Sequence, residues 1–411
     1  MNTFTAETGV LNRIVDSHAA YRRHCVRRVV RSAGSDIGDR SARFEVRYDL
    51  KMANRPRITQ SSIAKKLGVS ISTVSRALQG HPGYNRETTE LVHKTAAELG
   101  YVPNLTARAL VSNRRLRIGV VTPKQILSVY SQVRQGIEDE VRPFLAMGVE
   151  VVPYTFSRLG KGEVEAFDCA LKEDMSGVVL VPGDLPHLKQ SFTRAEKLKV
   201  PVVCLLTDAP GYTKLTTVAV NAYSCGSLAG EILSRSLPLD RRSIAIATGD
   251  LMITDHSQKT SAFQGAVKLT SPESIIYPPI ENHESEKEAY SATLAFLKRH
   301  KALGGLYIGT GNGVPVLDAV KAAGMLDKIA IVATNVFPEL IPLIRSGKVV
   351  ATIFERPYSH GCIATRLLCD YLVNAVLPPP HVSLEPLLVM RSNLEAFQAR
   401  EDGGISATRL L

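Results

Sequence analysis

The chain has no long apolar segment and few cysteines. Among its 411 residues no apolar run approaches the roughly 20 residues needed to span a bilayer. The N-terminus lacks the apolar core that a secretory signal requires. The six cysteines form no C-x-x-C pair and have no metal-ligand spacing. We therefore expect no membrane partner and no metal, and we expect buried free thiols in a reducing cytoplasm.

The sequence also lacks the common catalytic signatures, namely G-x-S-x-G, H-E-x-x-H and a phosphate-binding loop. The segment 309–313 has the spacing G-x-G-x-G, which predicts a tight strand-to-helix turn and not a dinucleotide loop. The adjacent pair Asp255-His256 is too weak a pattern to indicate catalysis, and the segment His283–Glu286 is typical of a solvated helix start. We predict no enzyme, no catalytic residue and no cofactor.

Positive charge is concentrated in the N-terminal part of the chain. The formal net charge of the whole chain is +11. Residues 1–51 contribute +4, residues 52–117 contribute +8, and the remaining residues contribute −1. Since a nucleic-acid-binding module neutralises phosphates with Lys and Arg, this distribution favours a DNA partner for residues 52–117. A generally basic solvated surface would not leave the rest of the chain neutral.

Residues 58–78 predict two short helices joined by a tight turn. Thr59 can cap the first helix, and Ile63 and Leu67 lie four residues apart on one buried face. Gly68 follows as a left-handed C-terminal residue, and Ser70 can cap the second helix. This arrangement is typical of a helix-turn-helix, which reads base edges in a DNA groove.

The second helix has an apolar face and a polar face. Val69 and Val74 have the spacing of a hydrophobic staple, and Val74 and Leu78 continue the buried stripe. On the opposite face, Arg76 can bond two acceptors of a guanine, Ser72 can bond several base edges, and Ile71 can contact a thymine methyl. Ser75 and Gln79 share this face. The alternative is an ordinary helical hairpin whose polar face is only solvated.

Two further features follow in order. The first is a third helix at about 86–99, in which Leu91, Thr95 and Leu99 are in register on one face. The second is the segment Tyr101–Val111. With them, residues 58–111 closely resemble the DNA-binding region of the lactose repressor (LacI) family. The matching pieces are Ile63-Ala64, Gly68-Val69-Ser70, Thr73-Val74-Ser75-Arg76, Gly100-Tyr101-Val102-Pro103-Asn104 and Ala107-Arg108-Ala109-Leu110.

This resemblance implies a set of DNA contacts. Residues 103–113 resemble the family's hinge helix and linker, which orders on the operator. Leu110 matches the leucine that the family inserts between base steps of the minor groove; its alternative role is that of a linker residue. The DNA-binding residues expected from the resemblance are Thr59, Ser70, Ile71, Ser72, Thr73, Ser75, Arg76, Asn104, Ala107 and Leu110.

After residue 116 the pattern changes to short strands rich in Val and Ile that alternate with helices. Such alternation predicts parallel sheets covered by helices on both faces. About 290 residues is long for a single sheet of this kind, so we expect two similar lobes. The predicted strands are 118–121, 149–152, 177–181, 202–206, 218–220, 244–247, 306–308, 329–332 and 349–354.

Polar residues follow several of these strands, where ligands bind in open α/β sheets. They are suited to a polyhydroxylated ligand, because polar groups bond hydroxyls and an aromatic ring covers an apolar sugar face. The candidate effector-binding residues are Tyr130, Asp184, Lys259, Asn312, Asn335 and Glu355. Each has an alternative role as a surface residue or a strand-end cap.

Residues 116–398 resemble, more loosely, the sugar-binding domain of the same family and the periplasmic ribose-type binding proteins. The matching pieces are 129–136, 217–221 with Gly226 and Ala229, and 351–357 with Gly361. Three residues depart from the family pattern: Lys259 replaces a frequent arginine, Asn335 a frequent aspartate, and Glu355 a frequent glutamine. The resemblance therefore implies a sugar, polyol or sugar acid as effector without selecting one.

The predicted organisation is an all-α helix-turn-helix domain (52–102), the hinge (103–113) and an α/β two-lobed periplasmic-binding-protein-like domain (114–398). A basic extension (1–51), where Met52 is an alternative start, precedes them, and a tail (399–411) without leucine heptads follows. We predict a sequence-specific repressor, active as a homodimer on palindromic double-stranded DNA in the bacterial cytoplasm and nucleoid. The alternatives are an effector-dependent activator, a co-repressor-dependent regulator, and, further off, a sugar transport protein or an α/β enzyme.

Overall fold

The computed structural model describes residues 59–78, 86–99, 115–238 and 240–402. The predicted extension 1–51, the alternative start at Met52, the hinge 103–113 and the end of the tail, 403–411, lie outside the described residues. The chain divides into two units, Met1–Arg57 and Ile58–Leu411, and every described residue belongs to the second unit. This unit contains a helical region and a larger α/β region.

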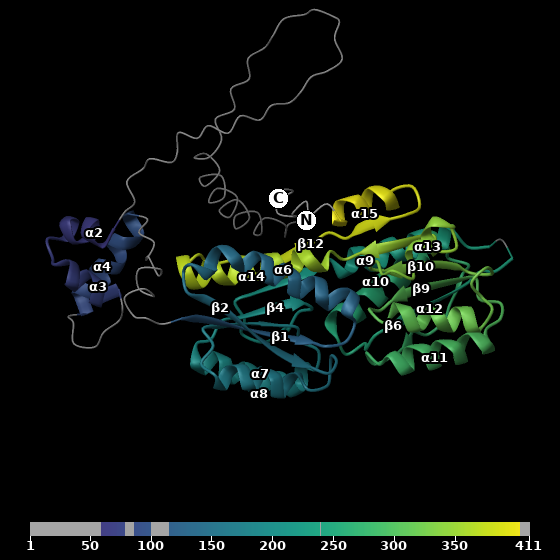
Figure 1. Ribbon diagram of the computed structural model, residues 1–411, viewed down its shortest axis with the longest axis horizontal. Coiled ribbons are helices and arrows are strands. Elements are labelled where there is room, and N and C mark those ends of the chain that lie inside the picture. The colour runs from purple at the N-terminus through teal and green to yellow at the C-terminus, as the bar shows by residue number, and fades with distance from the viewer. Residues whose placement is uncertain (1–58, 79–85, 100–114, 239, 403–411) are drawn as a thin grey trace, which may run out of the picture. The chain divides into compact units, whose positions relative to one another are not determined.

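The helical region consists of α2 (Gln60–Leu67), α3 (Ile71–Leu78) and α4 (Arg86–Leu99), drawn from purple to blue in Figure 1. Thr59 caps α2 as predicted: its hydroxyl accepts a hydrogen bond from the N–H of Ser62, and Ser62 Oγ accepts one from the N–H of Thr59. Gly68 ends α2 with φ of 67°, which a residue without a Cβ adopts at little cost. The predicted pair of helices is confirmed.

The core of the helical region differs from the sequence-based prediction in α4. Ile63 of α2, Val74 of α3 and Val92 of α4 are fully buried, whereas Leu91 is 51 % exposed. The buried face of α4 contains Val92, Ala96 and the predicted Thr95, and the predicted Leu99 packs against this core, so Leu91 alone of the predicted stripe lies outside it. An alanine was harder to recognise in the sequence as a core residue than a leucine.

The α/β region contains two sheets. The first has the strand order β12-β5-β4-β3-β1-β2, and all of its strand pairs are parallel. Its strands are β1 (Leu116–Pro123), β2 (Val149–Phe156), β3 (Gly177–Leu180), β4 (Val202–Leu206), β5 (Thr216–Val220) and β12 (His381–Leu384). Every residue of β3 and β5 is buried, as expected for a parallel sheet covered on both faces.

The second sheet has the order β13-β11-β10-β9-β6-β7, with β8 also paired to β6. Only the β11–β13 pair of this sheet is antiparallel. Its strands are β6 (Ser243–Thr248), β7 (Ile275–Ile276), β8 (Ile280–Glu281), β9 (Gly305–Gly309), β10 (Ala330–Thr334), β11 (Ala351–Phe354) and β13 (Leu387–Val389). The two-lobed architecture predicted from the sequence is confirmed.

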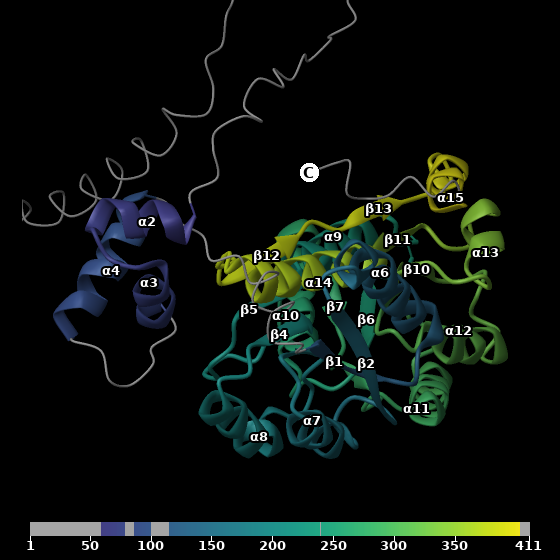
Figure 2. The same ribbon diagram turned by 60° about the vertical axis from the view of Figure 1, so that its left-hand side comes forward.

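Helices cover both sheets (Figures 1 and 2). In the first lobe α6 and α14 lie on one face of the sheet, and α7 and α8 lie on the other. These helices are α6 (Leu127–Leu145), α7 (Glu163–Lys172), α8 (Leu185–Leu198) and α14 (Pro357–Asn374). The second lobe contains α9 (Ala222–Arg235), α10 (Thr254–Thr270), α11 (Glu286–Arg299), α12 (Gly313–Ala322), α13 (Ile341–Arg345) and α15 (Leu394–Asp402).

The chain passes between the lobes three times, after β5, after β11 and after β12. Asn221 lies at the first of these passages, where its side chain accepts a hydrogen bond from the N–H of Ser224 and caps α9. Its Nδ2 also donates to Glu385 Oε1 at the third passage, at 2.9 Å. Two connecting segments that are far apart in the sequence are thus linked at one place.

Glycines allow two helix pairs to approach closely. A Cβ on Gly136 of α6 would lie 2.2 Å from the carbonyl oxygen of Tyr358 in α14. A Cβ on Gly226 of α9 would lie 2.1 Å from the carbonyl oxygen of Lys259 in α10. A side chain at either position would therefore force the two helices of the pair apart.

The described cysteines are free thiols, as predicted, and all of them except Cys169 are buried as predicted. Cys204, Cys225, Cys362 and Cys369 are buried, whereas Cys169 is exposed. Burial raises the pKa of the Cys204 thiol to about 12, so it stays protonated and behaves as a small apolar side chain. The predicted thiol at Cys25 lies outside the described residues.

Candidate functional site

The first candidate site is the start of α3. Ser70 Oγ accepts a hydrogen bond from the N–H of Thr73 at 3.0 Å, which is the predicted helix cap. The same oxygen lies 2.7 Å from Ser72 Oγ and 2.8 Å from Thr73 Oγ1. The hydroxyl of Ser70 is therefore engaged in the local structure, and it fixes the first turn of the helix.

The predicted polar face of α3 is directed away from the core of the helical region. Val74 and Ala77 are buried against α2 and α4. Ser72 and Arg76 are exposed, and Ile71 is 53 % exposed although it is a large β-branched residue. Ser75 and Thr73 are partly buried. The face that the sequence assigns to base contacts is thus accessible over its central residues.

The remaining predicted DNA contacts are placed only in part. Thr59 is exposed at the start of α2, where its side chain serves as the cap. Asn104, Ala107 and Leu110 lie outside the described residues. The DNA contacts as a set remain predictions.

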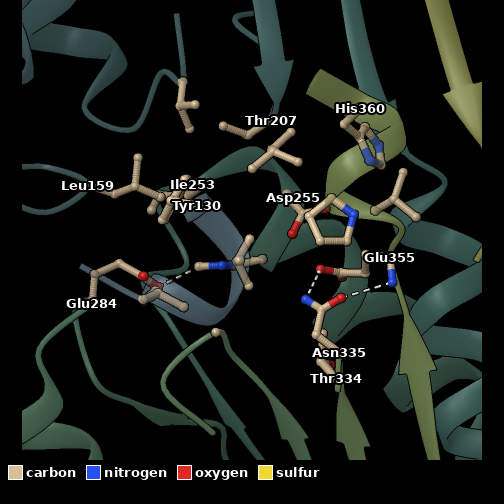
Figure 3. A pocket seen from close by; sticks show the side chains of 18 of the residues that line it. Tyr130, Leu159, Thr207, Ile253, Asp255, Glu284, Thr334, Asn335, Glu355 and His360 are labelled. Carbon is tan, nitrogen blue, oxygen red and sulfur yellow. Dashed lines mark hydrogen bonds and ion pairs between the residues drawn. The ribbon is translucent and has the colours of Figure 1, made fainter. Parts of the chain in front are cut away.

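The second candidate site is a pocket between the two lobes (Figure 3). The first lobe contributes mainly apolar side chains, among them Val129 and Leu159, together with the ring of Tyr130. The second lobe contributes most of the charged side chains. The cavity has a volume of about 70 Å³, which is room for about five water molecules. The polar residues that line the pocket are Tyr130, Thr207, Asp255, His256, Lys259, Glu284, Thr334, Asn335, Glu355 and His360.

A buried lysine holds two carboxylates at the base of the pocket. Lys259 is 2 % exposed, and its Nζ lies 2.5 Å from Glu355 Oε1 and 3.0 Å from Asp255 Oδ2. Burial alone would lower the pKa of Lys259, but the two carboxylates raise it well above its usual value. Lys259 is therefore a cation whose charge is matched within the protein.

Asn335 fixes the position of Glu355. Its Nδ2 donates to Glu355 Oε2 at 2.9 Å, and its Oδ1 accepts a hydrogen bond from the Glu355 N–H at 2.9 Å (Figure 3). The three residues that depart from the family pattern, Lys259, Asn335 and Glu355, therefore form one connected network. The carboxylate that the family pattern places after β10, at position 335, is replaced by a carboxylate after β11, at Glu355.

Tyr130 is also in the pocket, on the first turns of α6. Its side chain is 5 % exposed. Burial raises the pKa of its phenol well above the usual value, and the carboxylates of Glu284 and Asp255 add to this effect. The ring can serve as an apolar wall for a ligand, with a neutral hydroxyl at its end.

Two of the predicted effector-binding residues are not pocket-lining residues. Asp184 caps α8, where Oδ1 accepts from the N–H of His187 and Oδ2 lies 2.6 Å from His187 Nδ1. Asn312 is 3 % exposed and follows the pocket residue Gly311, and its Nδ2 has no hydrogen-bond partner. Tyr130, Lys259, Asn335 and Glu355 are brought together, while ligand contact by all six remains a prediction.

The interpretation of residues 283–286 as a solvated helix start was wrong for Glu284. The helix does begin there, at Glu286 with Ser285 as its cap, but Glu284 is 3 % exposed and lines the pocket. Its carboxylate lies against Gly249, where a Cβ would come within 1.9 Å of Oε1. His283 and Glu284 both have positive φ, and this turn directs Glu284 inward.

The pair Asp255-His256, which carries no catalytic signature, also belongs to the pocket. Asp255 lies in the first turn of α10, one helical turn before Lys259. His256 Nδ1 accepts a hydrogen bond from the N–H of Asp250 at 3.1 Å. The i, i+4 spacing of Asp255 and Lys259 was the signal in the sequence that could have found Asp255.

Unusual backbone conformations gather around the pocket. Ile126, Leu206, Glu284 and Asn335 have positive φ and line it, and His283 and Arg356 are direct neighbours of lining residues. For a β-branched residue such as Ile126 this conformation is strained. Strain of this kind persists where the surrounding structure enforces it, often at ligand sites.

Gly309 ends β9 and Gly313 begins α12, so the predicted strand-to-helix turn is confirmed. Across the described ranges, no helix has the length and apolar character to cross a membrane. Among the same residues, His, Cys, Asp and Glu side chains form no group of three or more that could hold a metal ion.

Comparison with known families matches two parts of the chain. Residues 61–104 match the bacterial regulatory proteins of the lacI family, and residues 118–375 match the periplasmic binding protein domain. The second match covers more than half of the chain. The two matches correspond to the helical region and to the two-lobed region.

Relatives that align with most of the chain occur in several bacteria. The catabolite control protein A of Staphylococcus aureus (strain MRSA252) is 24 % identical over 335 residues, which are 80 % of this chain and 96 % of that protein. The catabolite control protein A of Priestia megaterium is 23 % identical over 325 residues, 77 % of this chain and 92 % of that protein.

Solved structures share the two-lobed fold. A transporter solute-binding protein from Agrobacterium vitis with bound D-fucose has a TM-score of 0.63 at 17 % identity, covering 69 % of this chain and 98 % of that chain. A glucose-galactose binding protein from Geobacillus stearothermophilus has a TM-score of 0.60 at 20 % identity, covering 68 % and 99 %. At this level of identity the likeness concerns the fold alone.

Proposed function

The chain belongs to the lacI family of bacterial regulatory proteins, and we propose that it represses transcription as a homodimer on a palindromic operator under the control of a small effector. The family assignment makes it a DNA-binding transcription regulator and not an enzyme. The homodimer, the sign of regulation and the cytoplasmic location are parts of the proposal.

The observation that carries the proposal is the accessible face of α3. Ile71, Ser72 and Arg76 project from a helix whose other side is anchored by Val74 and Ala77. A guanidinium, a hydroxyl and a methyl-bearing side chain on one face are suited to base edges in a major groove. The basic excess of residues 52–117 supplies phosphate contacts.

The pocket between the lobes is the proposed effector site. The solved structures of similar fold include a solute-binding protein with bound D-fucose and a glucose-galactose binding protein. In this chain, Tyr130 offers a ring to an apolar sugar face, and the polar residues of the second lobe offer hydrogen bonds to hydroxyls. We therefore infer a carbohydrate-like effector.

Control of DNA binding follows from the position of the pocket. A ligand that contacts both lobes stabilises the closed arrangement over the open one, because only the closed arrangement makes both sets of contacts. The three chain segments that pass between the lobes serve as the pivot of this closure. In the proposed dimer, closure changes how two copies present their α3 helices, which couples effector binding to operator affinity.

The test is a selection of binding sites from randomised duplex DNA with the full chain. We expect enrichment of a two-fold symmetric sequence bound by two copies of the chain, with affinity that falls steeply as salt is raised. Failure to enrich any sequence would overturn the proposed operator binding. A panel of hexoses, polyols and sugar acids then shows whether an effector weakens binding, as in a repressor, or strengthens it, as with a co-repressor.

A further inference from the structure

We propose that the pocket selects a polyhydroxylated ligand that carries a positively charged amine, such as an amino sugar or an amino polyol, over neutral sugars and sugar acids. This inference rests on the proposed function, because it names the chemical class of the effector of that site. It narrows the sequence-based expectation of a sugar, polyol or sugar acid.

The first argument is the charge balance of the pocket. Among the pocket-lining residues that the structure describes, Lys259 is the only ammonium or guanidinium group, whereas Asp255, Glu284 and Glu355 are carboxyl groups. Lys259 already pairs with two of these three. A ligand carboxylate would therefore enter an acidic pocket without a cation to receive it, and its desolvation would go uncompensated.

The second argument is a pair of acceptors without donors. Asp255 Oδ1 and Glu284 Oε1 are buried oxygens with no hydrogen-bond partner, and the basic group beside Glu284 Oε1, His256 Nδ1, lies at 3.6 Å, beyond hydrogen-bond distance. Glu284 is 3 % exposed and faces the pocket from the side opposite Asn335 and Glu355 (Figure 3). A buried acceptor without a donor is costly, and an ammonium group, which has three donors and no acceptor, satisfies such oxygens.

The histidines of the pocket do not reverse this balance. His256 Nδ1 accepts a hydrogen bond from the N–H of Asp250, so this nitrogen carries no proton. His360 Nδ1 donates to the carbonyl of Arg356 at 2.9 Å, and burial lowers the pKa of its ring. The His360 ring therefore stays neutral near pH 7 and adds no positive charge, while His256 Nδ1 is engaged as an acceptor.

Protonation of Glu284 gives the inference a distinctive signature. Burial raises the pKa of Glu284 above its usual value, so without a bound cation this carboxyl group keeps its proton to a higher pH than a carboxyl group exposed to water. A ligand ammonium favours the carboxylate form, lowers this pKa and releases the proton. Affinity for the amine should then rise as pH rises through the raised pKa, whereas affinity for a neutral sugar should not.

The experiment is calorimetric titration of the full chain with probes matched in shape and different in charge. The first set is D-glucosamine, D-glucose and D-glucuronate, and the second, chosen for the small cavity, is serinol, glycerol and glycerate. Within at least one set we expect the amine to bind about tenfold more tightly than the neutral member or better, as a charge-assisted hydrogen bond implies. We also expect proton release in buffers of different ionisation enthalpy.

Variants locate the effect. Glu284→Gln keeps the shape of the side chain and should reduce the preference for the amine and abolish proton release. Glu286→Gln makes the same change two residues away at an exposed position and should change neither. The melting temperature of each variant reports whether it is folded, and the buffer dependence of the unmodified chain tests the inference even when a variant fails to fold.

The outcomes separate the two proposals. Tighter binding of the neutral or acidic member of both sets overturns the amine preference and leaves the proposed carbohydrate-like effector standing. Equal binding of all three members has the same consequence. If no probe of either set binds, both the amine preference and the proposed effector class are overturned, while operator selection still tests the DNA-binding function on its own.

Discussion

At the scale of single residues, Arg76 carries the specificity of the proposed DNA contact. Arg76→Ala removes a bidentate donor from the accessible face of α3 while Val74 and Ala77 keep the helix in place. We expect operator discrimination to fall by about 1–3 kcal/mol, with salt-dependent non-specific binding retained. Gel-shift titration on operator and scrambled duplexes measures both. Unchanged specific affinity would show that α3 is not the recognition helix.

Among the pocket-lining residues, Lys259 is the one whose replacement should lower the stability of the fold most. Lys259→Met leaves Asp255 and Glu355, which it now separates, without a cation. Removing one partner from a buried ion pair costs about 3–5 kcal/mol, and urea unfolding measures this loss. The double variant Lys259→Met/Glu355→Gln should recover part of it, because one unpaired charge disappears with the lysine. A double variant that is less stable than the sum of the single variants contradicts this reading.

The pocket also shows how far single residues can be predicted. Strand-end logic found Asn335 and Glu355, because the ends of parallel strands meet at one edge of a sheet, whereas Lys259, in the segment after β6, was found by its match to the family pattern. The same logic could not show that these three residues bond to one another. Glu284 was missed because its burial depends on two consecutive left-handed residues and on the absence of a Cβ at Gly249. Neither feature leaves a hydrophobic periodicity in the sequence from which the burial of Glu284 could have been predicted.

At the scale of elements, the strongest predictions concerned long or fully buried segments. The strand 202–206 and the helix 86–99 have the predicted bounds, and an apolar run delimits the strand. The short strands β7, β8, β12 and β13 were missed, since two to four residues are too short a segment to be recognised as a strand. Each of them pairs with a longer neighbouring strand.

The contact between α9 and α10 offers a test at this scale. Gly226→Ala introduces a Cβ that would lie 2.1 Å from the carbonyl oxygen of Lys259, so the two helices must separate. We expect destabilisation by about 1–3 kcal/mol, as for other overpacked sites. Gly265→Ala on α10 is the control, since its Cβ meets nothing within 4 Å and alanine is the better helix former. Thermal unfolding should move in opposite directions for the two variants, and a shared direction would refute the argument.

At the scale of the whole molecule, the two lobes are linked by a side-chain contact as well as by the three chain segments that pass between them. Arg158, in the loop between β2 and α7 of the first lobe, donates a hydrogen bond from Nη1 to the backbone carbonyl of His283 in the second lobe. His283 precedes Glu284, which lines the pocket. The contact therefore connects the relative position of the lobes with the turn that places a pocket residue.

This contact predicts how the balance between open and closed lobes can be changed without touching the pocket. Arg158→Ala removes a hydrogen bond between the lobes, so under the proposed lobe closure a smaller fraction of the chain is ready to hold a ligand. We expect the affinity for whichever probe binds to fall by about threefold to tenfold, with an increase in the radius of gyration measured by small-angle scattering. Arg194→Ala is the matched control, because Arg194 pairs with Asp168 inside the first lobe. If both variants weaken ligand binding equally, the effect lies in the first lobe itself and the argument fails. If only Arg158→Ala weakens ligand binding, the operator affinity of this variant should also change in the direction opposite to the change that the effector causes. That result would show that lobe closure transmits the signal.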